Sequence, residues 1–251
     1  MIVAHRGASA AAPENTFAAF ELAWEQGADG VECDVRLTAD GQLVCCHDAG
    51  TARTGDRALT VADSPWGELQ GVDVGQWRGQ AWHGERIPLL VDVLDRLPAG
   101  GRLFVEIKAG PACVPPLTQA VASHAAAPRI AILAFDAEVV AAVRQSLPEL
   151  EALWLVERSK HTAAPRWAPS PEQLVRTAHA CGATGLDVAV AGLTEDLVAA
   201  CRDAGLSLHA WTVNDADTVR ACARLGVQSI TTDDPVRMAV AVEECIDPAD
   251  D

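Results

Sequence analysis

Three side chains that can carry acid–base or metal chemistry occur close together near the N-terminus. Glu32 and Asp34 lie in one extended apolar run and His47 in a second, with only the four residues 38–41 between the two runs. Such a gap is too short for a crossover helix, so the second run should return as an antiparallel hairpin with Asp-Gly in its turn. Because side chains alternate along a strand, Glu32 and Asp34 share a face, and His47 returns roughly opposite Glu32. Two carboxylates and an imidazole should therefore converge.

A third carboxylate, Glu106, lies in another apolar run farther along the chain. Three carboxylates without a soft ligand suit a hard, oxygen-seeking cation such as Mg²⁺ or Ca²⁺. The alternative is that these acids pair with Arg6, Arg36 or Lys108 as salt bridges at strand ends. Three acids on adjacent inward positions would be costly without a cation, which favours a metal site.

Two histidines and two basic side chains complete the candidate site. His5 or His47 alone would be typical of a satisfied core histidine, but together, beside carboxylates, they indicate an acid–base pair. Arg6 and Lys108 are the basic groups available to hold a phosphate. Strict alternation after His5 would turn Arg6 to the other face, so Arg6 reaches the site only if the strand ends there, as Gly7 allows.

Alternating strand and helix patterns must position these residues. Eight strand-like runs occur at 2–4, 30–37, 103–108, 130–135, 152–156, 185–190, 206–213 and 228–232. Helical patterns follow at 13–26, 89–97, 114–126 and 138–146, and from about 172, 195, 216 and 235. This alternation predicts an α/β protein with a parallel sheet, and eight strands predict a closed (β/α)₈ TIM barrel with its site at the C-terminal strand ends. Trp211, Asn214 and Asp233 fall at such ends.

The chain is expected to form a single domain over 1–251 with one insertion after the second strand. Residues 49–87 are rich in Gly, Asp and Thr and lack a long periodic pattern. They should form a small cap held by Trp66, Trp77 and Trp82, fold over the barrel mouth and shape a pocket there. The tail from about 243 should fray.

Composition limits the partners and the location. With 35 acidic against 19 basic side chains, the net charge of −16 argues against nucleic acid and against stable association with an anionic membrane. A phosphate-bearing substrate would then need a bound cation and local basic groups. A first strand at Ile2 leaves no room for a signal peptide, and the eight cysteines contain no C-x-x-C pair. Buried free thiols in a reducing cytoplasm are expected; the oligomeric state is left open.

Nine short motifs resemble the glycerophosphodiester phosphodiesterase family, in order from residue 5 to about 235. They are His5-Arg6-Gly7, Glu14-Asn15-Thr16, the run 27–35, Thr38-Ala39-Asp40-Gly41, His47-Asp48, Ile87-Pro88-Leu89-Leu90, Glu106-Ile107-Lys108, Trp211-Thr212-Val213-Asn214 and Thr232-Asp233-Asp234-Pro235.

The resemblance implies a (β/α)₈ barrel that hydrolyses a glycerophosphodiester to sn-glycerol 3-phosphate and an alcohol. The glycerol 2-hydroxyl would attack phosphorus, and water would open the resulting cyclic phosphate. His5 is implied as general base and His47 as general acid. The implied ligands of one divalent cation are Glu32, Asp34 and Glu106. The expected substrate-binding residues are Arg6, Lys108, Trp211 and Asn15.

Two other readings stay open. One is a related barrel phospholipase of the sphingomyelinase D-like or phosphatidylinositol-cleaving type; the expected lack of a signal peptide, of an apolar loop cluster and of a basic surface ranks it lower. The other is a barrel that binds phosphodiesters without turnover, which the loss of a histidine or carboxylate would mark. After His47 the chain departs from the family pattern over 49–55, so the preferred head group is left open.

Overall fold

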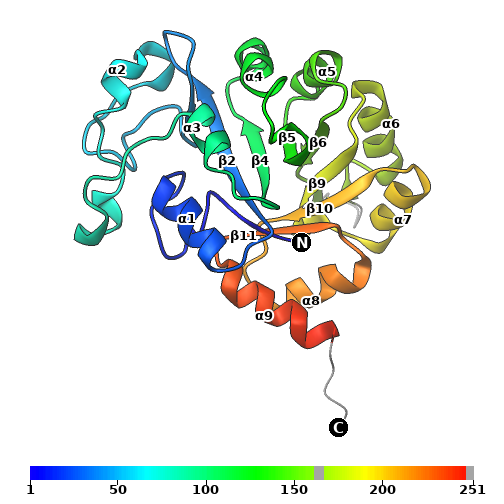
Figure 1. Ribbon diagram of the computed structural model, residues 1–251. Coiled ribbons are helices and arrows are strands. Elements are labelled where there is room, and N and C mark those ends of the chain that lie inside the picture. The colour runs from blue at the N-terminus through cyan, green and yellow to red at the C-terminus, as the bar shows by residue number, and fades with distance from the viewer. Residues whose placement is uncertain (161–166, 247–251) are drawn as a thin grey trace.

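The computed structural model describes residues 1–160 and 167–246 and contains a closed parallel barrel (Figure 1). Strand β1 pairs with both β2 and β11, which closes the sheet. The parallel strands are β1 (Ile2–Ala4), β2 (Gly30–Leu37), β4 (Arg102–Ile107), β5 (Ile130–Ala134), β6 (Glu151–Val156), β9 (Gly185–Ala189), β10 (Ser207–Trp211) and β11 (Ser229–Thr232). The predicted (β/α)₈ barrel is confirmed.

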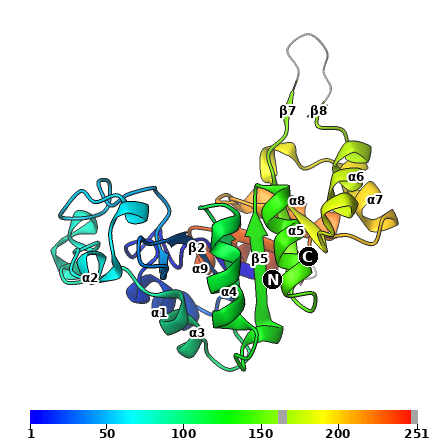
Figure 2. The same cartoon turned by 90° about the horizontal axis from the view of Figure 1, so that it is seen from above.

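Helices surround the barrel, and one short helix lies in the insertion beside it, as Figures 1 and 2 show. They are α1 (Phe17–Glu25), α2 (Trp66–Leu69), α3 (Leu90–Asp95), α4 (Val114–Val121), α5 (Ala137–Ser146), α6 (Pro171–Cys181), α7 (Glu195–Asp203), α8 (Ala216–Leu225) and α9 (Pro235–Ile246). Local signals set several ends: Thr16 caps α1, and Ser170 with Gln173 forms a capping box on α6. Helix α9 continues past 243, where the tail was expected to begin, and residues 247–251 lie outside the described part.

Two further strand pairs are present. Strand β3 (Leu43–Cys45) runs antiparallel to β2, with Val35 opposite Cys45, and this confirms the predicted hairpin. The same offset brings His47 level with Cys33, one residue from the expected position opposite Glu32. A second hairpin, β7 (Ser159–Lys160) with β8 (Trp167–Ala168), was not predicted and projects from the barrel between β6 and α6 (Figure 2).

The core has two layers. A large apolar layer lies between the strands and the helices, and a smaller cluster fills the barrel interior. The interior cluster consists of Val3, Phe104, Ala131, Leu133, Leu153 and Leu155. Because the interior is packed, polar chemistry is confined to the strand ends. Seven cysteines of the described chain are buried free thiols, as expected, and none of the described helices is long and apolar enough to cross a membrane.

The insertion 49–87 forms its own small subdomain beside the barrel (Figure 1). Besides α2 it contains 3₁₀ turns at Val61–Asp63, Gln76–Arg78 and Gln80–Trp82. Its core is aliphatic rather than built on tryptophans: Val44, Cys46, Val61, Leu69, Val72, Val74 and Ile87. Trp66 packs against this cluster, whereas Trp77 is 43% exposed. Aliphatic burial therefore stabilises the subdomain, contrary to the expectation.

Asp73 organises the second half of the insertion. Its buried carboxylate accepts hydrogen bonds from the backbone N–H groups of Gly75 (2.9 Å), Gln76 (3.0 Å) and Gly84 (2.7 Å). Although burial opposes ionisation, these donors lower the pKa of Asp73 to about 2. The unfolded-state pKa is about 3.9. The ionised carboxylate thus stabilises the fold above about pH 4, and this contribution disappears as the pH falls toward 2.

We expect Asp73→Ala to lower the free energy of unfolding by about 2–4 kcal/mol at pH 7, because three backbone donors lose a charged acceptor. Urea unfolding of both proteins at pH 7 and pH 3 measures the effect, and the difference should shrink at pH 3. Asp63→Ala, at an exposed position of the same insertion, should change little. An Asp73→Ala effect independent of pH would contradict the role of the ionised carboxylate.

Candidate active site

A cavity of about 300 Å³ opens at the C-terminal ends of the barrel strands. Its lining consists of His5, Arg6, Glu32, His47, Glu106, Lys108, Leu133, Phe135, Leu155, Glu157, Asp187, Trp211, Thr212 and Thr231. All the predicted site residues except Asp34 and Asn15 are among them. The barrel therefore brings together groups that are far apart in the sequence.

The three predicted metal ligands form one buried cluster. Glu32, Asp34 and Glu106 are 3%, 0% and 8% exposed, and each offers an oxygen within 4.8 Å of the others. Glu32 Oε1 is buried without a partner, and Asp34 Oδ1 and Glu106 Oε1 contact only the ammonium group of Lys108. Closely spaced, incompletely satisfied carboxylate oxygens fit a hard divalent cation.

The charges in this cluster are not balanced by the protein. Arg6 Nε lies 3.1 Å from Asp34 Oδ2, and Lys108 Nζ lies 2.6 Å from Glu106 Oε1 and 3.2 Å from Asp34 Oδ1. The salt bridges of the alternative reading are thus present, yet two cations face three acids, and Glu32 Oε1 keeps no partner. The cluster therefore contains the salt bridges of the alternative reading and still has more negative than positive charge. A divalent cation would neutralise the excess negative charge.

The pKa values of the cluster follow from this imbalance. Burial, reinforced by the charges of Asp34 and Glu106, raises the pKa of Glu32 well above its usual range. Burial also opposes ionisation of Asp34, but the positive charges of Arg6 and Lys108 outweigh it and lower the pKa of Asp34. Because a bound cation needs ionised ligands, it would act against this rise in the pKa of Glu32.

Arg6 reaches the site because the strand ends before it. Strand β1 stops at Ala4, and Arg6 takes a left-handed conformation at φ +57°. Its backbone N–H donates to Glu32 Oε2 at 2.9 Å, which ties this turn to the acid cluster. Gly7 is required next to it, at φ +82°, since a Cβ there would lie 2.5 Å from the carbonyl carbon of Ala19. The expected route for Arg6 into the site is therefore present.

Asn15 lies beneath the cavity rather than in it. It is 4% exposed; its Nδ2 donates to Asp34 Oδ2 at 2.7 Å, and its Oδ1 accepts from the Asp34 backbone N–H at 3.1 Å. Both ends of the amide are thereby used to orient Asp34. The amide of Asn15 thus contacts Asp34 in the structure, and its substrate-binding role stays a prediction.

Each histidine is held by an aspartate on its Nδ1 atom. His5 Nδ1 lies 2.6 Å from Asp233 Oδ1, and His47 Nδ1 lies 2.7 Å from Asp48 Oδ1. Asn214 Nδ2 donates to the other oxygen of Asp233 at 2.6 Å. A carboxylate at Nδ1 favours a proton there and leaves Nε2 of each ring for exchange with a substrate. No role was predicted for Asp48 or Asp233, although Asp48 follows His47 directly.

The insertion meets the site through Arg53. Its guanidinium donates to Asp48 Oδ2 at 2.6 Å and to Glu14 at 2.7 and 2.8 Å, and Glu14 also accepts from Arg6 at 2.9 Å. Arg53 thus links Asp48, the partner of His47, to Glu14, the partner of Arg6. No described residue of 49–87 lines the cavity, and the pocket wall expected from the insertion stays a prediction.

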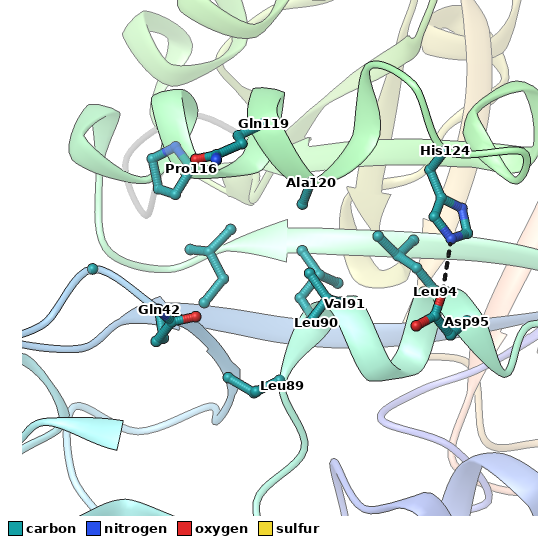
Figure 3. Close-up of a pocket in the computed structure, with 12 residues that line it drawn as sticks. Gln42, Leu89, Leu90, Val91, Leu94, Asp95, Pro116, Gln119, Ala120 and His124 are labelled. Atoms are coloured by element: carbon teal, nitrogen blue, oxygen red, sulfur yellow. Dashed lines mark hydrogen bonds and ion pairs between the residues drawn. The ribbon is translucent and has the colours of Figure 1, made fainter. Parts of the chain in front are cut away.

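A second depression, of about 460 Å³, lies between α3 and α4 (Figure 3). Its walls are mainly aliphatic, with Leu90 and Leu94 facing Ala120. Its one drawn ion pair joins His124 Nε2 to Asp95 Oδ1 at 3.2 Å. None of the predicted site residues lines this depression.

Cleavage of a phosphate ester requires positive charge around the phosphoryl oxygens and proton transfer at the attacking and leaving oxygens. The barrel mouth supplies basic groups and two oriented imidazoles, so fold and site together define a phosphoester hydrolase.

Comparison with known proteins narrows this class. The model of the glycerophosphoryl diester phosphodiesterase family matches residues 5–237. A probable glycerophosphodiester phosphodiesterase 1 of Mycobacterium tuberculosis is 34% identical, over 97% of this chain and 92% of its own. A glycerophosphodiester phosphodiesterase of Caldanaerobacter subterraneus is 33% identical, over 94% of each chain.

A solved structure agrees. An Oleispira antarctica phosphodiesterase, in complex with the product sn-glycerol-3-phosphate, has a TM-score of 0.87 and 26% identity, covering 97% of this chain and 96% of its own. The present chain belongs to the glycerophosphoryl diester phosphodiesterase family, and it is a phosphoric diester hydrolase.

Proposed function

We propose that this chain hydrolyses small glycerophosphodiesters to sn-glycerol 3-phosphate and a free alcohol with the help of one divalent cation, Mg²⁺ or Ca²⁺. The observation that carries the proposal is the buried cluster of Glu32, Asp34 and Glu106 beside two aspartate-held histidines. We further propose that the reaction serves glycerol and lipid metabolism in the cytoplasm.

The three acids would hold the cation, and Asn15 would keep Asp34 in place. When bound, such a cation would supply positive charge that stabilises the anionic phosphoryl group. Arg6 and Lys108, both lining the cavity, would orient the phosphate and oppose its charge. Their ion pairs with Asp34 and Glu106 fix both side chains before a substrate arrives.

The two histidines would divide the proton transfers. His5 Nε2 would accept the proton of the glycerol 2-hydroxyl as that oxygen attacks phosphorus, and His47 Nε2 would donate a proton to the departing alcohol oxygen. Asp233 and Asp48 hold the two rings in position through their Nδ1 atoms. A water then opens the cyclic phosphate with the two roles reversed, which restores the starting protonation.

Size and charge favour soluble diesters over a phospholipase activity. A cavity of about 300 Å³ is at the small end for ligand sites, and a net charge of −16 repels anionic bilayers. Both features support a short head group over a long acyl chain.

A coupled assay for glycerol 3-phosphate tests the proposal. Purified enzyme with Mg²⁺ or Ca²⁺ should release glycerol 3-phosphate from glycerophosphocholine, glycerophosphoethanolamine and glycerophosphoglycerol. Turnover of lysophosphatidylcholine alone would favour the phospholipase reading. Binding of every diester without product would favour the non-catalytic barrel.

A further inference from the structure

The cavity has two unlike halves. His5, Arg6, Glu32, His47, Glu106 and Lys108 line the half formed by β1, β2, β4 and the β2–β3 hairpin. The opposite half, from β5, β6, β9 and β10, is largely apolar, with Leu133 and Leu155 beside an aromatic pair. That pair is Phe135 and Trp211, whose ring centroids lie 5.6 Å apart at an angle of 87°.

One carboxyl group lies deep in this apolar half. Asp187 is 2% exposed, and it stands in β9 between Leu186 and Val188, which both belong to the helix-facing layer of the core. Alternation therefore points Asp187 into the barrel, where it is paired level with Leu155 of the interior cluster.

The Asp187 side chain has an unmet hydrogen-bonding capacity. Its Oδ1 atom is buried without a partner, and no basic group pairs with it in the described part of the chain. Burial, with the charge of Glu106, raises the pKa of Asp187 well above its usual range. The contact from Trp211 Nε1 goes to the backbone carbonyl of Asp187, at 3.1 Å. That contact fixes the indole but leaves the carboxyl group unused.

We propose that Asp187 binds the terminal hydroxyl of the substrate's glycerol group, the one that takes no part in the attack on phosphorus. This inference rests on the proposed function, which places phosphorus and the 2-hydroxyl in the charged half of the cavity. The rest of the glycerol then extends toward β9 and β10. Its C–H groups pack on Trp211, and its remaining hydroxyl meets the unpartnered Asp187 Oδ1.

The position of the second acid on this wall supports the assignment. Glu157 also lines the cavity, but it is exposed to solvent at the rim and needs no ligand to satisfy it. A buried group that lacks a partner discriminates strongly between ligands with and without the matching hydroxyl, whereas a hydrated one does not. Of the two acids on this wall, Asp187 and Glu157, Asp187 is thus the specificity-determining residue.

Two p-nitrophenyl phosphodiesters that differ in one hydroxyl test this role. The glyceryl ester carries both hydroxyls, and the 2-hydroxypropyl ester keeps the attacking hydroxyl but lacks the terminal one. With divalent metal present, we expect the wild type to prefer the glyceryl ester by about 100-fold or more in kcat/KM. Asp187→Ala should lose about 100-fold on the glyceryl ester and change less than about threefold on the other. Asp187→Asn should fall between the two.

Glu157→Gln is the matched control and should keep the full preference. Thermal unfolding gives a second readout: Asp187→Asn should be at least as stable as the wild type, because it removes an unpaired buried acid. Equal losses of Asp187→Ala on both esters, or a wild type that turns over both without preference, would overturn the inference alone. A wild type that cleaves neither ester and releases no glycerol 3-phosphate from glycerophosphocholine would overturn the proposed function together with it.

Discussion

Removal of divalent cations should lower turnover of glycerophosphocholine by at least about 1,000-fold, and Mg²⁺, Mn²⁺ or Ca²⁺ should restore it. The physical reason is the charge at the barrel mouth. The acid cluster has three carboxylates, Glu32, Asp34 and Glu106, and its described salt bridges come from two basic residues, Arg6 and Lys108. The whole protein also carries a net charge of −16. An anionic diester meets repulsion unless a cation offsets the acids.

Direct metal binding separates this explanation from a general loss of structure. We expect Asp34→Ala, Glu32→Ala and Glu106→Ala each to weaken binding of Mn²⁺ in calorimetric titrations as well as the rate. Asp95→Asn changes an acid of the α3–α4 groove and should leave both unaffected. Full activity in thoroughly demetallated enzyme would contradict the proposal that the three carboxylates hold a catalytic cation.

Replacement of the general acid should be rescued by a better leaving group, and replacement of the base should not. A p-nitrophenolate departs without protonation, whereas choline needs a proton as it leaves. We expect His47→Ala to lose about 1,000-fold on glycerophosphocholine but less than about tenfold on glyceryl p-nitrophenyl phosphate. His5→Ala should lose about 1,000-fold on both, because the attacking hydroxyl keeps its proton.

The pH profile gives an independent readout of the same roles. Burial lowers the pKa of His47 even though its bond to Asp48 acts in the opposite direction. An acid must be protonated to act, so activity on glycerophosphocholine should decline as the pH rises through this lowered pKa. The same limb should be absent on the activated ester, whose leaving group needs no proton. His124→Ala, outside the barrel mouth, serves as control. Rescue of His5→Ala instead would exchange the two roles, and rescue of both would show that the division is wrong.

Sequence patterns alone predicted the architecture and most residues of the candidate site. The alternation of strand and helix patterns predicted eight parallel strands, because each apolar run could be buried only against a following helix. The four-residue gap at 38–41 required the hairpin that returns His47. Strand alternation and the C-terminal strand ends then placed the acids, histidines and basic groups in one region, without knowledge of any distance.

Which polar groups have hydrogen-bond partners depends on the tertiary structure. Asn15 was expected to meet substrate but bonds Asp34 at both ends of its amide, which depends on how the turn before α1 packs under β2. The pairing of His5 with Asp233 joins residues 228 positions apart, and only closure of β1 onto β11 brings them together. Local patterns carry no information about such contacts.

The same holds for the insertion and for Asp187. Trp77 suggested an aromatic core in 49–87, but burial depends on which side chains meet in space, and aliphatic residues fill that core. In the sequence of β9, Asp187 is one polar residue in an otherwise apolar strand. Its lack of a partner became visible only when the neighbouring strands surrounded it, because an unmet hydrogen bond is a property of the surroundings rather than of the residue.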